Sequence, residues 1–397
     1  MLKRFSLVVM LAAVFAGSLL AVQTPAYFPK AGEWRKAAPE TAGLDPAKLA
    51  EAVKFSIDNE NTGNKDLAIQ IPLDFRNEAP YNTVDGPTQV RAGASGIVIR
   101  HGSVVAEWGD TNRADMTFSV TKTFLSTVVG LAYDRGLIKN VTDRAADYMP
   151  KGVDLFTSEK NAPITWEHLL RQTSDWSGTL FNQPDWADRP AGGQTPEQWP
   201  NRQKFETGTN YKYNDTRVNV LALATLYVMK KPLPEILKTS IMDPIGASNT
   251  WRWEPYTNAY VTIDGKRMPS VPGGGHHGGG MFISAWDLAR FGYLFLQNGK
   301  WSGKQLISEK WIGMARSPGP ANTQYGYMNW FLNTKDAVVN GRPARQMYPA
   351  APASAVAFRG NGENIVLVDW EHDMVAVFRW IRGANGFVDR LMASVVK

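Results

Sequence analysis

The chain has 397 residues, 44% hydrophobic and 20% charged, which is enough for one large globular domain with a sizeable core. A formal net charge of +6, without a dense basic run, argues against a nucleic-acid partner. The absence of cysteine excludes thiol catalysis, disulfides and a lipid-anchored amino-terminal cysteine.

The first 26 residues have the pattern of a secretory signal peptide. Two basic residues precede a mostly apolar run from Phe5 to Ala21. This run is at the short limit for spanning a bilayer, so we expect cleavage near Ala21 or Ala26 rather than a retained anchor. Residues 27–397 would then form a single periplasmic or secreted domain without stable membrane insertion.

Strand patterns occur near both ends of the chain. In the segment 96–110, two β-branched runs flank His101-Gly102 and predict a hairpin. The runs 364–370 and 374–380 flank a short polar link, and a last helix is expected from about Val388. These strands predict one antiparallel sheet built from both termini.

Helical periodicity dominates the rest of the chain. A helix is expected from Pro46, with Asp45 as its cap. From Ser119, apolar residues recur at helical spacing until about Arg135. Further helical segments between about 140 and 270 predict a helical insertion. The expected fold class is α/β of the α+β type, an antiparallel sheet flanked by helices and carrying this insertion.

Ser119 and Lys122 stand three residues apart at the start of a predicted helix, so their side chains share one face. A serine hydroxyl needs an adjacent base, and lysine can serve where burial or a second cation lowers its pKa. Backbone N–H groups at a helix start also suit a developing oxyanion. However, S-x-x-K occurs by chance, and a serine cap followed by a snorkelling lysine also explains it. The pair alone leaves both interpretations open.

Two further segments favour the catalytic interpretation of Ser119 and Lys122. "FETGTNYKYNDT" (205–216) places Tyr213 in a polar loop before an apolar helix, and "FRGNGENIVLVDW" (358–370) places a glycine-rich edge before a strand. In order, the three segments resemble the S-x-x-K, Y-x-N and K-T-G or H-x-G motifs of the serine β-lactamase-like superfamily. From about Thr41 onward the chain resembles its class C β-lactamase-like hydrolases, above all the esterase and 6-aminohexanoate-dimer hydrolase branch.

The resemblance implies a role for each motif residue. Ser119 matches the acylated nucleophile, Lys122 the group that helps remove its proton, and Tyr213 the tyrosine that relays a proton toward the leaving group. The oxyanion hole would use the Ser119 N–H and one from the strand edge around Gly362 and Glu363. This mechanism requires no metal and no organic cofactor.

Two positions depart from the motifs of the family. Asp215 stands where asparagine is usual, so an amide donor toward the substrate is replaced by an acceptor. Gly360 stands at the cation of K-T-G or H-x-G. Arg359 could replace that cation, although alternation along a strand would point it to the other face. Both departures predict a substrate without an obligatory carboxylate there and weaken the case for β-lactams.

The segment "GGGHHGGG" (273–280) contains two adjacent histidines. Adjacent residues in an irregular loop rarely bind one ion, so we expect no metal site. Flanking glycines predict a loop pressed against the pocket, where His276 or His277 would line the substrate site, and we favour His277. The alternative is a turn before a helix capped by Ser284.

The sequence therefore predicts an exported serine hydrolase that forms an acyl-enzyme at Ser119 and cleaves small-molecule esters or linear amides. A β-lactamase or D-Ala peptidase of the penicillin-binding type is the alternative within the same chemistry. A catalytically silent binding protein on the same fold is the alternative of another class. The oligomeric state stays open.

Overall fold

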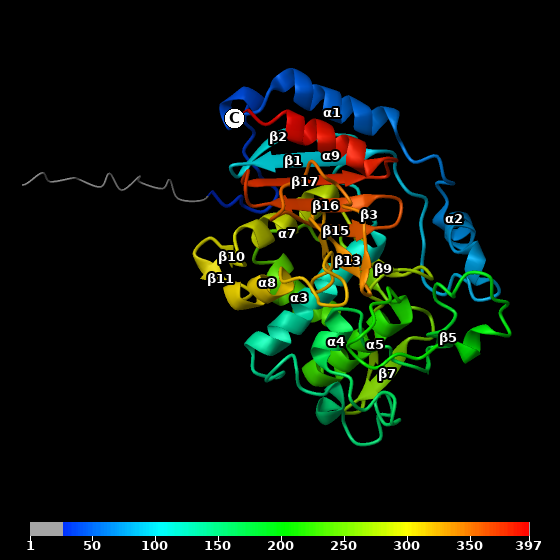
Figure 1. Ribbon diagram of the computed structural model, residues 1–397. Coiled ribbons are helices and arrows are strands. Elements are labelled where there is room, and N and C mark those ends of the chain that lie inside the picture. Colours follow the sequence, from blue (N-terminus) through cyan, green and yellow to red (C-terminus); the bar gives the residue numbers. More distant parts are fainter. Residues whose placement is uncertain (1–26, 397) are drawn as a thin grey trace, which may run out of the picture.

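The computed structural model describes residues 27–396 (Figure 1). The predicted signal peptide lies outside these residues. In the described part of the chain, no helix combines the length and the apolar character needed to cross a membrane. Figure 1 shows a layered region, with a sheet between helices, above a region of helices and long connecting segments.

The layered region is built on a six-stranded antiparallel sheet with the order β12-β15-β16-β17-β1-β2. Its strands are β1 (Ser95–Arg100), β2 (Ser103–Trp108), β12 (Trp330–Phe331), β15 (Val356–Gly360), β16 (Asn364–Asp369) and β17 (Met374–Arg379). Ile97 pairs with Val377, so strands from the two ends of the chain lie side by side. The predicted hairpin and the predicted sheet from both termini are confirmed.

Helices cover both faces of this sheet. On one face, α1 (Pro46–Asp58) packs with α9 (Ala384–Ala393), and on the other α7 (Ala285–Leu296) contacts β1, β16 and β17 (Figure 1). Asp45 caps α1, as expected, and Ser284 caps α7, as the alternative interpretation of the histidine segment had it. The last helix begins earlier than predicted, directly after Gly383, whose left-handed φ of 75° ends the preceding turn.

The helix after Ser119 lies between the sheet side and the lower region. A short turn, η3 (Phe118–Val120), leads into α3 (Thr121–Asp134), which is almost wholly buried. Phe124 stacks on Phe291 of α7, with ring centroids 3.9 Å apart. Because α3 is packed on both sides, its first turn is held in a fixed position relative to the sheet.

The predicted helical insertion is only partly helical. It contains α4 (Trp166–Leu170), α5 (Asp215–Met229) and α6 (Leu233–Leu237), with the small hairpins β4 (Thr179–Leu180) with β5 (Gln183–Pro184) and β7 (Tyr260–Ile263) with β8 (Lys266–Pro269). The long connection from α4 to α5 is irregular apart from the β4–β5 hairpin and one short turn. It is held by buried ion pairs that no periodicity signals.

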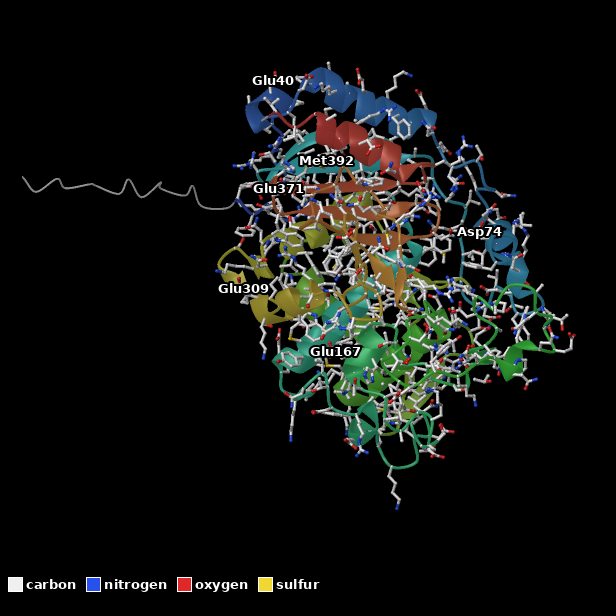
Figure 2. All side chains as sticks on the ribbon, in the orientation of Figure 1. Glu40, Asp74, Glu167, Glu309, Glu371 and Met392 are labelled. Carbon is white, nitrogen blue, oxygen red and sulfur yellow. The ribbon has the colours of Figure 1, made fainter. Side chains whose placement is uncertain are left out.

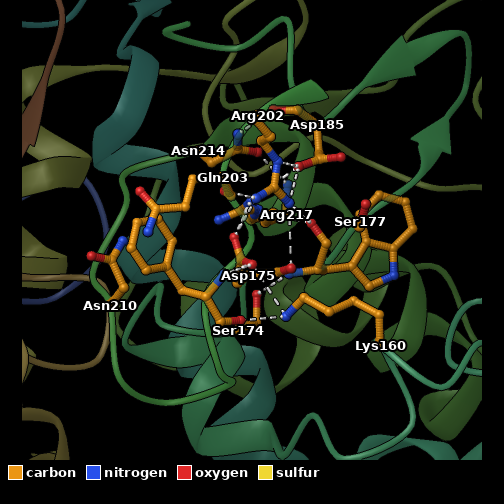
Figure 3. Close-up of polar contacts among 12 residues, drawn as sticks. Lys160, Ser174, Asp175, Ser177, Asp185, Arg202, Gln203, Asn210, Asn214 and Arg217 are labelled. Atoms are coloured by element: carbon orange, nitrogen blue, oxygen red, sulfur yellow. Dashed lines mark hydrogen bonds and ion pairs between the residues drawn. The ribbon is translucent and has the colours of Figure 1, made fainter. Parts of the chain in front are cut away.

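Figure 3 shows these ion pairs. Arg217 of α5 donates from Nη2 to Asp175 Oδ1 and Asp185 Oδ2, both at 2.9 Å. Arg202 contacts the same two carboxylates, and Lys160 lies 3.1 Å from Asp175 Oδ2. Two carboxylates and three cations thus tie the connection to α5.

The remaining elements are short. They are α2 (Leu67–Asp74), α8 (Glu309–Ala315), β3 (Asp115–Met116), β6 (Arg252–Glu254), β9 (Gly280–Ile283), β10 (Lys300–Trp301), β11 (Lys304–Gln305), β13 (Val338–Val339) and β14 (Arg342–Pro343). β3, β9 and β6 form a three-stranded sheet that fixes the histidine loop just before β9. Figure 2 shows side chains filling the space between the two regions, with Glu40 and Glu309 on the outside.

Candidate active site

A cavity of about 260 Å³ lies where four segments meet: η3, the end of β15, the loop before α5 and the histidine loop. It is lined by Phe75, Phe118, Ser119, Arg189, Tyr213, Asp215, Gly274, His276, Trp330, Arg359, Gly360, Asn361, Glu363 and Ile365. Apolar and charged side chains share its wall, which is typical of small-molecule sites.

The structure brings Ser119 and Lys122 together on one side of this cavity. Lys122 Nζ lies 2.9 Å from Ser119 Oγ. Ser119 stands in η3 and Lys122 in the first turn of α3, so the predicted common face is confirmed. The Lys122 side chain is only 1% exposed. An amine so deeply buried requires a counterion.

Asp215, the first residue of α5, supplies that counterion. Burial favours the neutral form of Lys122, but the negative charge of Asp215 outweighs burial and raises the lysine pKa. Burial likewise opposes the Asp215 carboxylate, yet Lys122 and Arg189 hold its pKa well below the usual range. Lys122 is therefore a cation in the resting site, and it donates to Ser119 rather than offering a free lone pair.

Asp215 also belongs to a wider buried charge cluster, formed by Glu78, Lys122, Asp188, Arg189, Asp215 and His276. Asp215 Oδ2 accepts from Arg189 Nη1 at 2.9 Å and lies 3.3 Å from His276 Nδ1. His276 Nε2 lies 2.6 Å from Glu78 Oε2, and Asp188 contacts both Arg189 and the Asp215 N–H. The cluster thus contains three carboxyl groups, one lysine, one arginine and one histidine.

His276 is the titratable link in this cluster. Burial disfavours its charge, but Asp188, Asp215 and Glu78 outweigh burial and raise its pKa to about 9. With His276 protonated, the three cations balance the three carboxylates. Burial and the neighbouring His276 lower the pKa of His277 to about 4, so the two adjacent histidines differ in charge at neutral pH.

Ligand atoms of Glu78, Asp188 and His276 lie within 4.8 Å of one another, close enough to hold a metal ion. Both ring nitrogens of His276 already face carboxylates, and Arg189 lies against Asp188. A divalent cation would add charge to a cluster that its own side chains neutralise. These residues therefore do not fit a metal ion well, and we assign none.

Tyr213 reaches the same cavity from the loop before α5. Its ring stacks on Trp330, with centroids 5.7 Å apart and planes at 28°. Lys122 Nζ lies 4.6 Å and Arg189 Cζ 5.0 Å from the ring centroid. Tyr213, which is distant in sequence, is thus brought beside the Ser119 and Lys122 pair.

At the strand edge, the residue that approaches the nucleophile is Gly360 rather than Gly362. A Cβ on Gly360 would collide with the Thr117 carbonyl oxygen and lie 3.1 Å from the Ser119 nitrogen. Gly362 instead turns away, with φ 72°, and faces the Trp380 ring, so its expected place beside Ser119 is corrected. Glu363 does line the cavity, as does Asn361.

The glycine-rich histidine loop is pressed against the site, as predicted. A Cβ on Gly274 would collide with Asp215 Oδ1 and Lys122 Nζ. The expectation for His277 is corrected, because His276 lines the cavity instead. The His277 Nδ1 lies 3.0 Å from the Thr83 carbonyl oxygen, and its ring packs against Tyr256, which directs it away.

Arg359 also lines the cavity, against the expectation from strand alternation. Its long side chain extends over Trp330 and Tyr348, with Cζ 5.7 and 5.4 Å from the ring centroids. Phe75, Glu78, Asp188 and Arg189 were missed entirely, since they belong to no motif and reach the site only through tertiary contacts. A family alignment would be the signal able to find them.

Comparison with known proteins defines the class. Among solved structures, a family VIII carboxylesterase has a TM-score of 0.52 at 16% identity, covering 91% of this chain and 98% of its own. A β-lactamase from Mycobacterium bovis has a TM-score of 0.51 at 18% identity, covering 82% and 99%. At such identities the likeness shows the fold, which is that of the β-lactamases and penicillin-binding proteins.

The family follows from sequence. The Beta-lactamase family model matches residues 76–385, so this chain belongs to the Beta-lactamase family of hydrolases, and the resemblance inferred from its motifs is confirmed. A 6-aminohexanoate-dimer hydrolase from Paenarthrobacter ureafaciens is 25% identical over 254 residues, which cover 59% of this chain. The alignment spans 60% of that relative, less than two thirds of its length.

Proposed function

We propose that this protein is a serine hydrolase that cleaves ester or small linear amide bonds through an acyl-enzyme at Ser119. The observation that supports it most is the 2.9 Å contact between Lys122 Nζ and Ser119 Oγ. This contact opens onto a cavity shared with Tyr213. The esterase and amide-hydrolase relatives are consistent with this substrate class.

In acylation, Ser119 Oγ attacks the substrate carbonyl carbon and the bond to the leaving group breaks. The cationic Lys122 stabilises the negative charge that develops on Oγ. Tyr213 relays the proton, accepting it from the serine while donating its own to the leaving oxygen or nitrogen. In deacylation, water attacks the ester carbonyl and its proton returns to Ser119 by the same relay.

The oxyanion hole in this proposal uses two backbone N–H groups. The first is that of Ser119, for which we find no backbone acceptor among the described residues. The second lies at the strand edge around Gly360 and Asn361, which the close approach of Gly360 brings beside the Ser119 nitrogen. The carbonyl oxygen would sit between the two donors.

A β-lactamase or penicillin-binding activity is the second candidate, and Arg359 favours it. Its guanidinium lines the cavity and has no carboxylate within ion-pair distance among the described residues, so it offers a cation for a substrate carboxylate. Asp215 argues the other way, because its two oxygens are engaged by Lys122 and Arg189 and no amide donor stands there.

The amino-terminal sequence pattern adds export to the proposal. Mass spectrometry of the form released by the host should find a new amino terminus near Ala21 or Ala26. A released form that retains residues 1–26 would contradict export by signal cleavage.

Turnover of nitrophenyl esters, nitrocefin and short ω-amino-acid amides, measured side by side, tests the function. The native protein should favour an ester or an amide over nitrocefin. Ser119→Ala should lose turnover by several orders of magnitude with its melting temperature preserved. A Ser119→Ala protein with native ester hydrolysis would contradict the proposal.

A further inference from the structure

A second cavity, of about 240 Å³, lies beside the catalytic cavity, and Arg189 lines both. We call it the tryptophan pocket and define it by Trp186, Trp199, Phe205 and Lys212, with Arg189 at the shared wall. It is formed by the irregular connection before α5, and no step of the proposed mechanism uses it.

The aromatic wall of this pocket is held in place. The Trp186 ring packs edge-on against Tyr81, with centroids 5.1 Å apart and planes at 86°. Trp199 is buried, and its Nε1 donates to the Gln194 carbonyl oxygen at 3.2 Å. Rigid indole faces suit a planar apolar group, because they bury it at little cost in side-chain entropy.

Of the cations that line the pocket, Arg189 and Arg202 are paired with carboxylates, whereas Lys212 is not paired with any in the described part of the chain. Asp175, the carboxylate in its wall, is already paired with Lys160, Arg202 and Arg217. Lys212 has no carboxylate within ion-pair distance among residues 27–396. Burial, with help from Arg217, lowers the pKa of Lys212, although Asp188 and Asp185 oppose this. An anion in this pocket would supply Lys212 with an ion-pair partner.

We propose that the tryptophan pocket binds a planar apolar group that carries a carboxylate, as the distal arm of the substrate that Ser119 cleaves. This rests on the proposed function. The indole faces take the apolar part, and Lys212 pairs with the carboxylate. Arg189 lies between the two cavities with its side chain 34% exposed. The arm therefore passes along Arg189 from the catalytic cavity into the tryptophan pocket.

Two substrates test this proposal. One is the nitrophenyl ester of 3-phenylpropanoate, and the other is the same ester with a carboxylate at the para position of the phenyl ring. In the native protein, kcat/KM should be about tenfold higher for the carboxylated ester. Lys212→Met should lower the ratio of the two values about tenfold, mainly through KM. Lys204→Met, an exposed lysine of the same segment outside the pocket wall, should leave the ratio unchanged. An unchanged ratio in Lys212→Met, or an equal fall in Lys204→Met, would overturn the proposal.

A binding measurement on a protein that cannot turn over substrate tests the tryptophan pocket independently of the proposed hydrolase function. The Ser119→Ala protein should bind 4-propylbenzoate saturably in a calorimetric titration, and adding Lys212→Met or Trp186→Leu should weaken that binding at least tenfold. Binding without any ester hydrolysis by the native protein would support the site and contradict the function. Hydrolysis by the native protein with no such binding would overturn the site alone.

Discussion

Gly360 is placed so that a single methyl group would disturb the nucleophile. A Cβ there meets the Thr117 carbonyl and approaches the Ser119 nitrogen, both backbone atoms that cannot swing aside. Gly360→Ala should therefore shift Ser119 and the oxyanion donor, lowering kcat about 100-fold, as losing one such donor does. Steady-state ester hydrolysis measures this.

Gly313→Ala is the matched control. Gly313 lies exposed in α8 with open space around its Cα, so alanine should keep full activity and add about 0.5–1 kcal/mol of stability. Equal activities of the two alanine variants would contradict the placement of Gly360 beside the nucleophile.

Asp215 links the catalytic lysine to the buried charge cluster. Asp215→Asn would leave Lys122 and Arg189 with one carboxylate fewer between them, and unbalanced buried charge costs about 3–5 kcal/mol. We expect that loss in urea unfolding, together with reduced ester turnover. A variant of native stability would show that the cluster is not the charge-balanced unit we describe.

At this scale, the sequence predicted the residues that carry a motif. Ser119, Lys122 and Tyr213 could be named because three segments of the chain, in order, resemble the motifs of the family, whereas the spacing of Ser119 and Lys122 alone left their role open. Arg189 could not, because it approaches Asp215 only through the irregular connection before α5. The choice between His276 and His277 depended on the loop backbone, where successive glycines have positive φ.

Among the elements, local signals predicted α1, α7 and the β1–β2 hairpin well. Each has a capping residue or a turn next to a segment in which apolar residues recur at helical or strand spacing. The insertion from about 140 to 270 was predicted as helical, and within it the connection between α4 and α5 is mostly irregular. Ion pairs between residues distant in sequence stabilise this connection, and the periodicity of apolar residues does not reveal such pairs.

Arg217→Met should loosen that connection. Removing the guanidinium leaves Asp175 and Asp185 buried with less compensation, a loss of about 3–5 kcal/mol. Limited proteolysis should then cut between residues 171 and 214 first. Lys54→Met, which breaks an exposed pair with Asp58, should change neither the cutting nor stability by more than about 1 kcal/mol. Equal protease resistance of the two variants would contradict this.

For the whole molecule, the two adjacent histidines limit stability at opposite ends of the pH range, His276 at alkaline pH and His277 at acidic pH. The folded pKa of His276, about 9, lies above its unfolded value of about 6.5, so its contribution is complete below pH 6.5 and lost as pH rises through 9. The folded pKa of His277, about 4, lies below 6.5, so its contribution is complete above pH 6.5 and lost as pH falls through 4.

Stability should therefore be greatest near neutral pH and fall on both sides. Each shift corresponds to a loss on the order of 3 kcal/mol. Urea unfolding from pH 4 to 10 measures the profile, and His276→Gln should flatten its alkaline side while lowering stability at pH 7. An alkaline side unchanged in that variant would assign the loss to another group.

The central claim is that Ser119 is the nucleophile. Its most direct measurement is labelling with a fluorophosphonate, followed by mass spectrometry of the digested protein. We predict one equivalent of label, located on Ser119, with no label on the Ser119→Ala protein. An unlabelled native protein, or a label on another residue, would contradict the account.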